Sequence, residues 1–276
     1  MKTRIITAAV MLALFVPILW FSHLIVYPIA MALLAAVAAW ELLKCLGLLR
    51  DLAVSVPTVL LVAGLTAAAR FVGGALIQLA IVAVVFFLLA LYLFAVTVLR
   101  AGRLPYGSLM GVLGGSFYLA VAFSAMVLLR DLPNGSYLFL LPFLGAWITD
   151  TFAYFTGRLF GRHKLAPVIS PKKTVEGSIG GILFAIGAFA LFGAILSGRG
   201  LSPNYPALLL CGLLVSVVSQ IGDLALSAIK REYGIKDYGR LFPGHGGVLD
   251  RFDSVIATAP LILFFCLLGS GFSLFS

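Results

Sequence analysis

Charged residues are scarce in this chain. Of its 276 residues only 11% are Asp, Glu, Lys or Arg, whereas 62% are apolar and the mean hydropathy is +1.16. A soluble domain carries about 25% charged residues, so this chain lacks the polar side chains to cover a surface that faces water. The scarcity excludes a soluble globular domain and a disordered chain. A membrane-spanning helix uses about 20 apolar residues, so the apolar fraction suffices for roughly eight or nine such helices.

Cysteine is scarce as well. The three cysteines, Cys45, Cys211 and Cys266, are odd in number and have no metal-ligand spacing, which excludes a disulfide scaffold and a cysteine-based zinc site. They are interpreted as packed apolar residues. A cleavable signal peptide is not apparent, because the first apolar run has no clear small-residue cleavage site. The internal repeats of duplicated transporters are not visible either.

The apolar runs predict an all-α, polytopic membrane protein with about nine transmembrane helices. We expect a single membrane domain over residues 1–276, with five helices in 1–135 and four in 136–276. The second part also carries two polar cytoplasmic loops, 157–177 and 230–253. The predicted helices are Ile5–Phe21, Leu24–Leu43, Leu52–Ala69, Ala75–Leu99, Leu109–Leu129, Tyr137–Thr156, Ser178–Leu196, Tyr205–Ile229 and Ser254–Leu274.

The positive charges predict the orientation of these helices. With a cytoplasmic N-terminus, 16 of the 19 Lys and Arg residues fall in cytoplasmic segments, and three (Arg70, Arg130 and Arg199) fall on the opposite side. The positive-inside rule therefore predicts N-in and C-out. The net charge of +9 is then a membrane feature, and nucleic acid is not expected as a partner. Ten of the 16 cytoplasmic cations lie in the two long loops, which topology alone does not explain. The cytoplasmic cations are Lys2, Arg4, Lys44, Arg50, Arg100, Arg103, Arg158, Arg162, Lys164, Lys172, Lys173, Lys230, Arg231, Lys236, Arg240 and Arg251.

Several of the ten carboxylates have simple interpretations. Asp51 and Asp131 follow Arg50 and Arg130 in short loops, and each is interpreted as half of a solvated pair. Glu41 lies near the end of the second predicted helix. It is expected either to be interfacial or to pair with a basic loop.

Four other carboxylates predict a site near the cytoplasmic face: Asp150, Asp223, Asp250 and Asp253. A carboxylate inside a membrane costs about 2.5–3.5 kcal/mol, so it has a partner or a function. Gln220, Asp223, Ser227 and Lys230 share one helical face, and so do Asp250 and Asp253. We expect the carboxylates of the last two helices to meet. Oxygen ligands without His or Cys favour Mg²⁺, and Mg²⁺ beside many cations favours a polyphosphate substrate. The alternative is that Asp223 forms a purely structural pair with a lysine or arginine.

Both polar loops contain candidate phosphate-binding segments. Ser170-Pro171-Lys172-Lys173-Thr174 precedes a predicted helix, where backbone amides attract anions, but the glycines of a Walker loop are absent. Pro243-Gly244-His245-Gly246-Gly247 allows close approach of the backbone to a phosphate. His245 is expected to bind phosphate or to orient a carboxylate, with a structural turn residue as the alternative.

The second loop resembles a known family. From Ser227 to Asp253 the chain reads S-x-x-K-R-x₄-K-D-x-G-x-x-F-P-x-H-G-G-V-x-D-R-F-D, which is similar to the signature of phosphatidate cytidylyltransferases. The region of Asp150 and the Ser170–Thr174 segment also resemble this family, so the resemblance covers roughly the second half of the chain. It implies a nucleotidyltransferase of phospholipid biosynthesis that uses Mg²⁺ to make CDP-diacylglycerol and pyrophosphate from CTP and phosphatidate. It further implies a homodimer in the bacterial cytoplasmic membrane, with the active site facing the cytoplasm.

The resemblance also suggests a role for each polar residue of these segments. The implied Mg²⁺ ligands, in one site or a two-metal site, are Asp223, Asp250, Asp253 and Asp150. The implied catalytic residues are Asp223, Asp250, Lys230, Arg231 and His245. The implied substrate-binding residues are Ser170, Lys172, Lys173, Thr174, Ser227, Lys236, Gly246 and Gly247.

Two other functions remain open at this point. A CTP-dependent polyprenol or phytol kinase would use similar charges but transfer the γ-phosphoryl group. An ion-coupled transporter would use Asp150 and Asp223 as a relay, but it would spread polar residues over several helices. The D-G-x-x-A-R pattern of CDP-alcohol phosphotransferases is absent.

Overall fold

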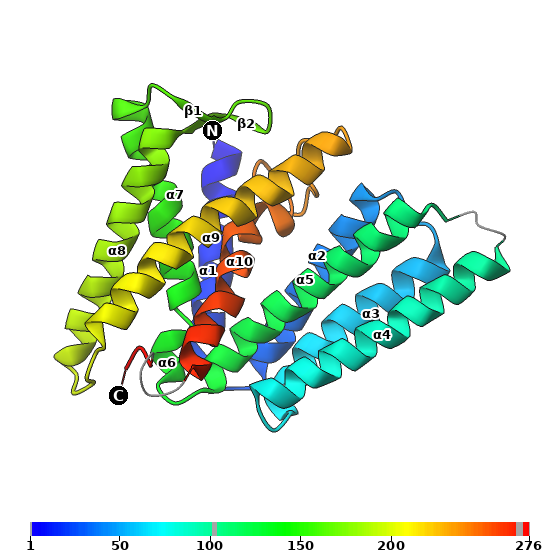
Figure 1. The fold of residues 1–276 in the computed structure, drawn as a ribbon, viewed down its shortest axis with the longest axis horizontal. Helices are drawn as coiled ribbons and strands as arrows, with labels where there is room; N and C mark the ends of the chain where they lie inside the picture. Colours follow the sequence, from blue (N-terminus) through cyan, green and yellow to red (C-terminus); the bar gives the residue numbers. More distant parts are fainter. Residues whose placement is uncertain (1, 101–103, 269–272, 276) are drawn as a thin grey trace. The chain divides into compact units, whose positions relative to one another are not determined.

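The computed structural model describes residues 2–100, 104–268 and 273–275 (Figure 1). The predicted cytoplasmic cation Arg103 and residues 269–272 of the last predicted helix lie outside the described residues. The described chain is helical except for one short antiparallel hairpin, and it separates into two compact units. Unit 1 comprises residues 1–131 and 232–252, and unit 2 comprises 132–231 and 253–276.

Unit 1 is a bundle of apolar helices (Figure 1). Helix α5 packs against α2, α3 and α4, and its buried side chains, among them Phe123 and Met126, form the centre of the unit. Contact between α2 and α5 is close, because a Cβ atom at Gly115 would lie 2.5 Å from Leu42. Small residues at such a crossing let two membrane helices approach. The elements of unit 1 are α1 (Lys2–Trp20), α2 (Val26–Cys45), α3 (Leu52–Ala68), the 3₁₀ helix η1 (Ala69–Phe71), α4 (Ala75–Leu99) and α5 (Tyr106–Asp131).

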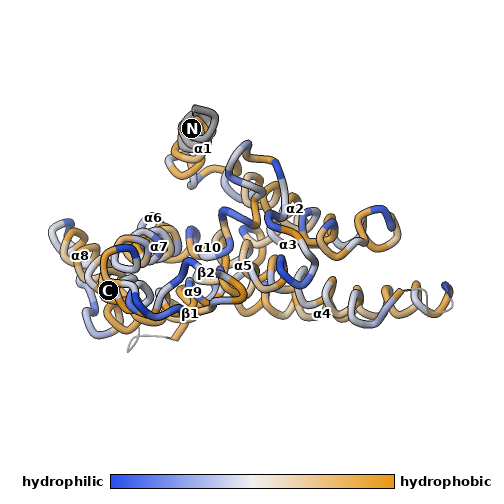
Figure 2. Tube along the Cα trace, turned by 90° about the horizontal axis from the view of Figure 1, so that it is seen from above, coloured by the Kyte–Doolittle hydropathy of each residue, from blue (hydrophilic) through white to orange (hydrophobic). Residues whose placement is uncertain are grey.

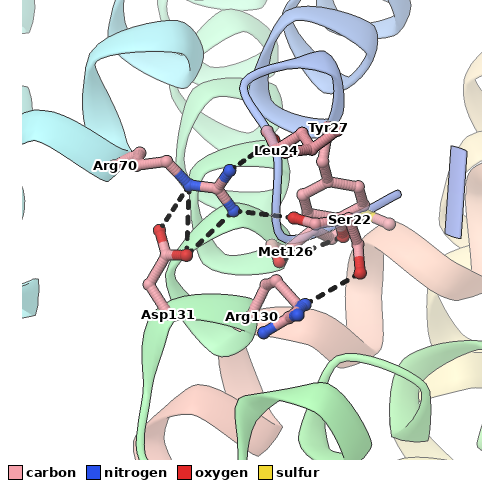
Figure 3. A network of polar contacts seen from close by, with 7 residues as sticks. All are labelled: Ser22, Leu24, Tyr27, Arg70, Met126, Arg130 and Asp131. Atoms are coloured by element: carbon pink, nitrogen blue, oxygen red, sulfur yellow. Dashed lines mark hydrogen bonds and ion pairs between the residues drawn. The ribbon is translucent and has the colours of Figure 1, made fainter. Parts of the chain in front are cut away.

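A polar network joins three connections of unit 1 (Figure 3). The Arg70 guanidinium, at η1, forms an ion pair of 2.8 Å with Asp131 at the end of α5. It also donates to the carbonyl oxygens of Leu24 at 2.6 Å and Ser22 at 3.0 Å, in the turn between α1 and α2. Arg130 donates to the Ser22 hydroxyl at 2.8 Å. We call these residues the Arg70 network.

The structure corrects two predicted charge pairs. Asp131 pairs with Arg70, and Asp51 pairs with Arg100 at the end of α4, whereas the sequence neighbours Arg130 and Arg50 had been expected. Arg130 and Asp131 are neighbours on α5, and adjacent residues on a helix do not face each other. Both observed pairs connect different helices of unit 1.

Unit 2 is built around α7 and α8, which pack along each other. Helix α8 presents glycines to α7: a Cβ atom at Gly177 would lie 2.6 Å from the Ala153 carbonyl oxygen. Helix α9 is joined to α7 by a buried hydrogen bond from Thr149 to Ser216 of 2.9 Å. The elements of unit 2 are α6 (Gly135–Leu138), α7 (Leu141–Phe160), β1 (Lys164–Ala166), β2 (Ser170–Thr174), α8 (Val175–Ser197), α9 (Tyr205–Glu232) and α10 (Leu249–Leu267); the last residue of α9 and the first turn of α10 belong to unit 1.

The prediction of an all-α protein with several membrane-spanning helices is confirmed. Within the described ranges, seven helical segments are long and apolar enough to cross a membrane, and hydrophilic stretches gather at helix ends and in loops (Figure 2). The other two predicted spans form α1 and α10, and their crossing of the membrane stays a prediction. Helix α10 ends at Leu267 rather than at the predicted Leu274, and Phe275 forms a β-bridge with Pro203.

Candidate active site

The first polar loop of the sequence forms a hairpin that had not been predicted. Strands β1 and β2 pair antiparallel, with Lys164 opposite Thr174 and Ala166 opposite Ser170. The hairpin ends directly at α8, where the Thr174 hydroxyl accepts a hydrogen bond of 3.1 Å from the amide of Gly177. Thr174 is thus the N-cap of α8, a structural role that sequence reasoning had not given it.

The hairpin separates the two lysines of the Ser-Pro-Lys-Lys-Thr segment. Successive side chains of a strand point to opposite faces. Lys172 is exposed, whereas Lys173 is partly buried, and its Nζ lies 2.6 Å from an Asp223 carboxylate oxygen. The structure therefore brings Lys173 to Asp223 from a distant part of the sequence. Ser170, at the start of β2, is partly buried.

Asp223 lies on α9 and has a second polar neighbour. Ser227, one turn later, donates a hydrogen bond of 3.3 Å to its other carboxylate oxygen. This confirms that Asp223 and Ser227 share a helical face. A quarter of each side chain in the Lys173–Asp223 pair is exposed, so solvent reaches the pair.

Asp253, in the first turns of α10, completes a cluster of three carboxylates in unit 2. Its carboxyl group interacts electrostatically with Asp223 and Asp150 as like charges, and with Lys230 as an opposite charge. We call Asp150, Asp223 and Asp253 the acidic cluster. Lys173 and Lys230 are its two cations, and the Lys230 side chain is buried.

Arg231 follows Lys230 at the end of α9. Its Nε atom donates to the Ile169 carbonyl oxygen at 3.4 Å, in the turn of the hairpin. Arg231 is exposed and belongs to the same unit as the acidic cluster. The sequence-predicted residues Ser227, Lys230 and Arg231 thus lie on the last turns of one helix.

The donor set of the acidic cluster fits a hard divalent cation. All three side chains offer carboxylate oxygens, the ligands that Mg²⁺ prefers. Like-charged carboxylates repel unless a cation lies among them, and in the structure the Lys173 ammonium group holds one Asp223 oxygen. The agreement is one of ligand type and not of geometry, because among the described residues no group of three or more His, Cys, Asp or Glu side chains is arranged so that it could hold a metal ion.

The second polar loop, between α9 and α10, belongs to unit 1. Phe242 and Gly246 form a β-bridge around a tight turn, and Gly246 has a φ of +91°, which favours glycine. His245 lies inside this turn, with its carbonyl oxygen accepting from Arg251 at 2.7 Å. Its Nδ1 atom is buried and has no hydrogen-bond partner within the described part of the chain. Lys236 is exposed at the start of the loop.

The Asp250 carboxylate is bound by backbone amides of this loop. One of its carboxylate oxygens accepts the amides of Tyr238 at 2.8 Å and Gly247 at 2.9 Å. Its side chain is buried, and a Cβ atom at Gly246 would lie 2.7 Å from the same oxygen. The predicted meeting of Asp250 with Asp223 stays a prediction, because the two residues belong to different units.

Sequence reasoning foresaw the partner of Glu41 only in part. Its buried carboxylate accepts hydrogen bonds from the backbone amides of Val248 and Leu249 in the second polar loop. The predicted alternatives were an interfacial position or a pair with a basic loop; Glu41 does meet a basic loop, but through backbone amides and not through a cationic side chain. The available signal was a lone carboxylate in an apolar helix, which predicts a partner without identifying it.

Comparison with known proteins gives a consistent result. The sequence profile of the Cytidylyltransferase family matches residues 2–268. A protein of Staphylococcus haemolyticus named phosphatidate cytidylyltransferase is 37% identical over 268 residues, which is 95% of this chain and 97% of that protein. Proteins of the same name from Staphylococcus epidermidis and Staphylococcus aureus are also 37% identical over 95% of this chain and 97% of their own length. The similarity therefore includes the N-terminal helices, in which no motif had been recognised.

Proposed function

The chain belongs to the cytidylyltransferase family and acts as a phosphatidate cytidylyltransferase, and we propose how its residues carry out this reaction. The enzyme is a nucleotidyltransferase of phospholipid synthesis, embedded in the membrane by several helices. A phosphate oxygen of phosphatidate attacks the α-phosphorus of CTP. A new P–O bond forms, the bond from the α-phosphorus to the bridging oxygen breaks, and pyrophosphate leaves. The products are CDP-diacylglycerol and pyrophosphate.

The reaction needs charge neutralisation and alignment rather than a strong base. The attacking phosphate oxygen is already ionised at neutral pH, so no proton must be removed from it. The triphosphate and the lipid phosphate repel each other, and catalysis consists mainly of bringing them together in line. Residues that hold phosphate oxygens and a cation are therefore the expected machinery.

We assign the cation to the acidic cluster. Asp223 and Asp253 would hold Mg²⁺, with support from Asp150, and Asp250 stays a proposed ligand. Mg²⁺ supplies positive charge that neutralises phosphate oxygens in the transition state. The observation that carries this assignment is the gathering of three carboxylates beside Lys173 and Lys230.

The polar residues of the hairpin, of the end of α9 and of the second polar loop are proposed to bind phosphates. Lys173 forms an ion pair with Asp223 of the acidic cluster, and it would turn from Asp223 to a phosphate oxygen when the cation is bound. His245 offers its buried Nδ1 atom, and Gly246 and Gly247 offer backbone in a tight turn. The remaining proposed phosphate-binding residues are Lys172, Lys230, Arg231, Lys236, Ser170, Thr174 and Ser227.

The products test this function directly. Purified protein in detergent is supplied with Mg²⁺, phosphatidate and CTP labelled at either the α- or the γ-phosphorus. We expect the α-label in the lipid product and the γ-label in pyrophosphate, in equal amounts. A CTP-dependent lipid kinase would instead put the γ-label in the lipid and release CDP, with a lipid alcohol as acceptor.

We further propose the orientation N-in and C-out, with both polar loops facing the cytoplasm of a bacterial cell, and a homodimeric assembly. The charge distribution of 16 against three supports the orientation. Single cysteines introduced at Lys164 and Arg240 should be labelled only from the cytoplasmic side, and one introduced after Leu274 only from outside. A C-terminus labelled from inside would overturn the orientation. Crosslinking in the membrane tests the dimer.

A further inference from the structure

Glu41 is a buried charge in an unusual place. It lies near the end of α2, in a stretch of alanine, leucine and tryptophan, and only 6% of the residue is exposed. Placing a carboxylate in such surroundings is unfavourable unless hydrogen bonds compensate for the loss of water. The compensation comes from residues about 200 positions further along the chain.

Both oxygens of Glu41 are used at the start of α10. One accepts the amide of Val248 at 3.1 Å, and the other accepts the amide of Leu249 at 2.9 Å. These amides lie at the N-terminus of a 19-residue helix, where backbone N–H groups need acceptors and negative charge is favoured. Val248 has no side-chain oxygen to cap the helix, so Glu41 supplies the cap from another helix of the same unit.

The loop is built closely around this carboxylate. A Cβ atom at Gly239 or at Gly247 would lie 2.0 Å from the same Glu41 oxygen. Two glycines from separate parts of the loop therefore leave the space that the Glu41 carboxylate occupies. Asp250 holds the same loop from the other end, through the amides of Tyr238 and Gly247.

We propose that Glu41 is a positioning residue that keeps the segment Tyr238–Leu249 in its substrate-binding conformation. The inference rests on the proposed function, because Gly246, Gly247 and His245 in this segment are the proposed phosphate-binding residues. Without Glu41 the ordered conformation of the loop becomes a minor state. The apparent substrate affinity is then multiplied by the fraction of molecules in which the loop is still ordered. The rate of reaction of the bound complex changes less.

The primary test compares Glu41→Gln with Asp51→Asn. Glu41→Gln keeps the shape and one acceptor oxygen but presents an NH₂ group to the second backbone amide. Asp51→Asn is the matched control, because it removes a carboxylate and an ion pair of unit 1 that do not contact this loop. Hydrogen exchange of the peptides covering 238–249 is measured in detergent, together with kcat and KM for CTP and phosphatidate.

For Glu41→Gln we expect faster hydrogen exchange in residues 238–249 and unchanged exchange in the other helices. The KM for CTP or phosphatidate should rise about tenfold or more, which corresponds to a loop that is ordered in a tenth of the molecules. Asp51→Asn should show neither effect. Unchanged exchange and KM in Glu41→Gln would overturn the proposal, and so would a general loss of protection like that of a destabilised control. The exchange result does not depend on activity, so it separates failure of this inference from failure of the proposed function.

A double-mutant cycle tests the contact itself. Gly239→Ala should increase exchange in the same peptides, because the new methyl group would collide with Glu41. In a Glu41→Ala background the space is empty, so Gly239→Ala should add little further effect. Fully additive effects would mean that Gly239 and Glu41 do not meet.

Discussion

The molecule contains two polar clusters that differ in their charge balance. In the Arg70 network, one carboxylate pairs with one of two guanidinium groups, and backbone carbonyls and a hydroxyl group accept further hydrogen bonds from these groups. In the acidic cluster, three carboxylates interact, and one of the two neighbouring cations forms a direct ion pair with Asp223. The first cluster joins loops, and the second lies within the helices α7, α9 and α10.

We interpret the difference as that between a structural cluster and the proposed metal site. In the Arg70 network the carboxylate is paired with a cation, and both guanidinium groups donate to protein oxygens, so the network needs no ligand to balance its charge. Like charges held together store unfavourable electrostatic energy, which a bound cation relieves. We therefore expect changes in the acidic cluster to abolish activity and changes in the Arg70 network to affect mainly stability.

The largest effect is expected for Asp223→Asn. An amide has nearly the same shape as a carboxylate but is a poor Mg²⁺ ligand, so turnover should be lost while the protein stays folded in the membrane. Activity is measured at saturating Mg²⁺, and folding by gel filtration in detergent. If Asp223→Asn keeps more than about a tenth of the wild-type activity, Asp223 is not a ligand of the metal.

A smaller but clear effect is expected for Lys173→Ala. A charge-assisted contact in a partly dry site contributes about 1.5–3 kcal/mol, which corresponds to roughly a 10- to 150-fold loss of rate or affinity. Lys172→Ala should lower the rate or the affinity less, because Lys172 is exposed on the other face of β2. Lys44→Ala, on the same predicted side of the membrane, should cost less than about 1 kcal/mol. Equal, small effects at the three lysines would show that the Ser170–Thr174 segment acts only in setting the membrane topology.

The smallest effect on activity is expected for Asp131→Asn in the Arg70 network. The Asp131 side chain is one-third exposed, so losing its ion pair should lower stability by about 1 kcal/mol or less. The midpoint of thermal unfolding in detergent measures this, and cytidylyl transfer at low temperature should stay near wild type. A large loss of activity without a loss of stability would give the Arg70 network a functional role.

Local patterns in the sequence predicted the features that local physics determines. The apolar runs predicted nine helical segments, and seven helical segments of the described chain are long and apolar enough to cross a membrane. Such segments can be recognised locally, because lipid requires every backbone group of a span to be paired within it. Polar residues with helical spacing, such as Asp223 and Ser227, were placed correctly on one face. The hairpin was missed because Pro171 and two lysines lack the apolar alternation of a strand.

Contacts between distant residues could not be predicted in the same way. Nothing near Glu41 in the sequence indicates the amides of Val248 and Leu249, and nothing near Lys173 indicates Asp223. The expected pairs Arg50–Asp51 and Arg130–Asp131 were wrong because sequence neighbours were preferred over helix neighbours. Such partners become visible only once the helices are packed.

Direct measurement of cation binding tests the central claim, that the acidic cluster holds the metal. Mn²⁺, which is paramagnetic and prefers the same oxygen ligands, is titrated into the purified protein without substrates and followed by electron paramagnetic resonance. The account predicts saturable binding that is lost in Asp223→Asn and Asp253→Asn but kept in Asp131→Asn. Binding that is equally strong in wild type, Asp223→Asn and Asp253→Asn would contradict it.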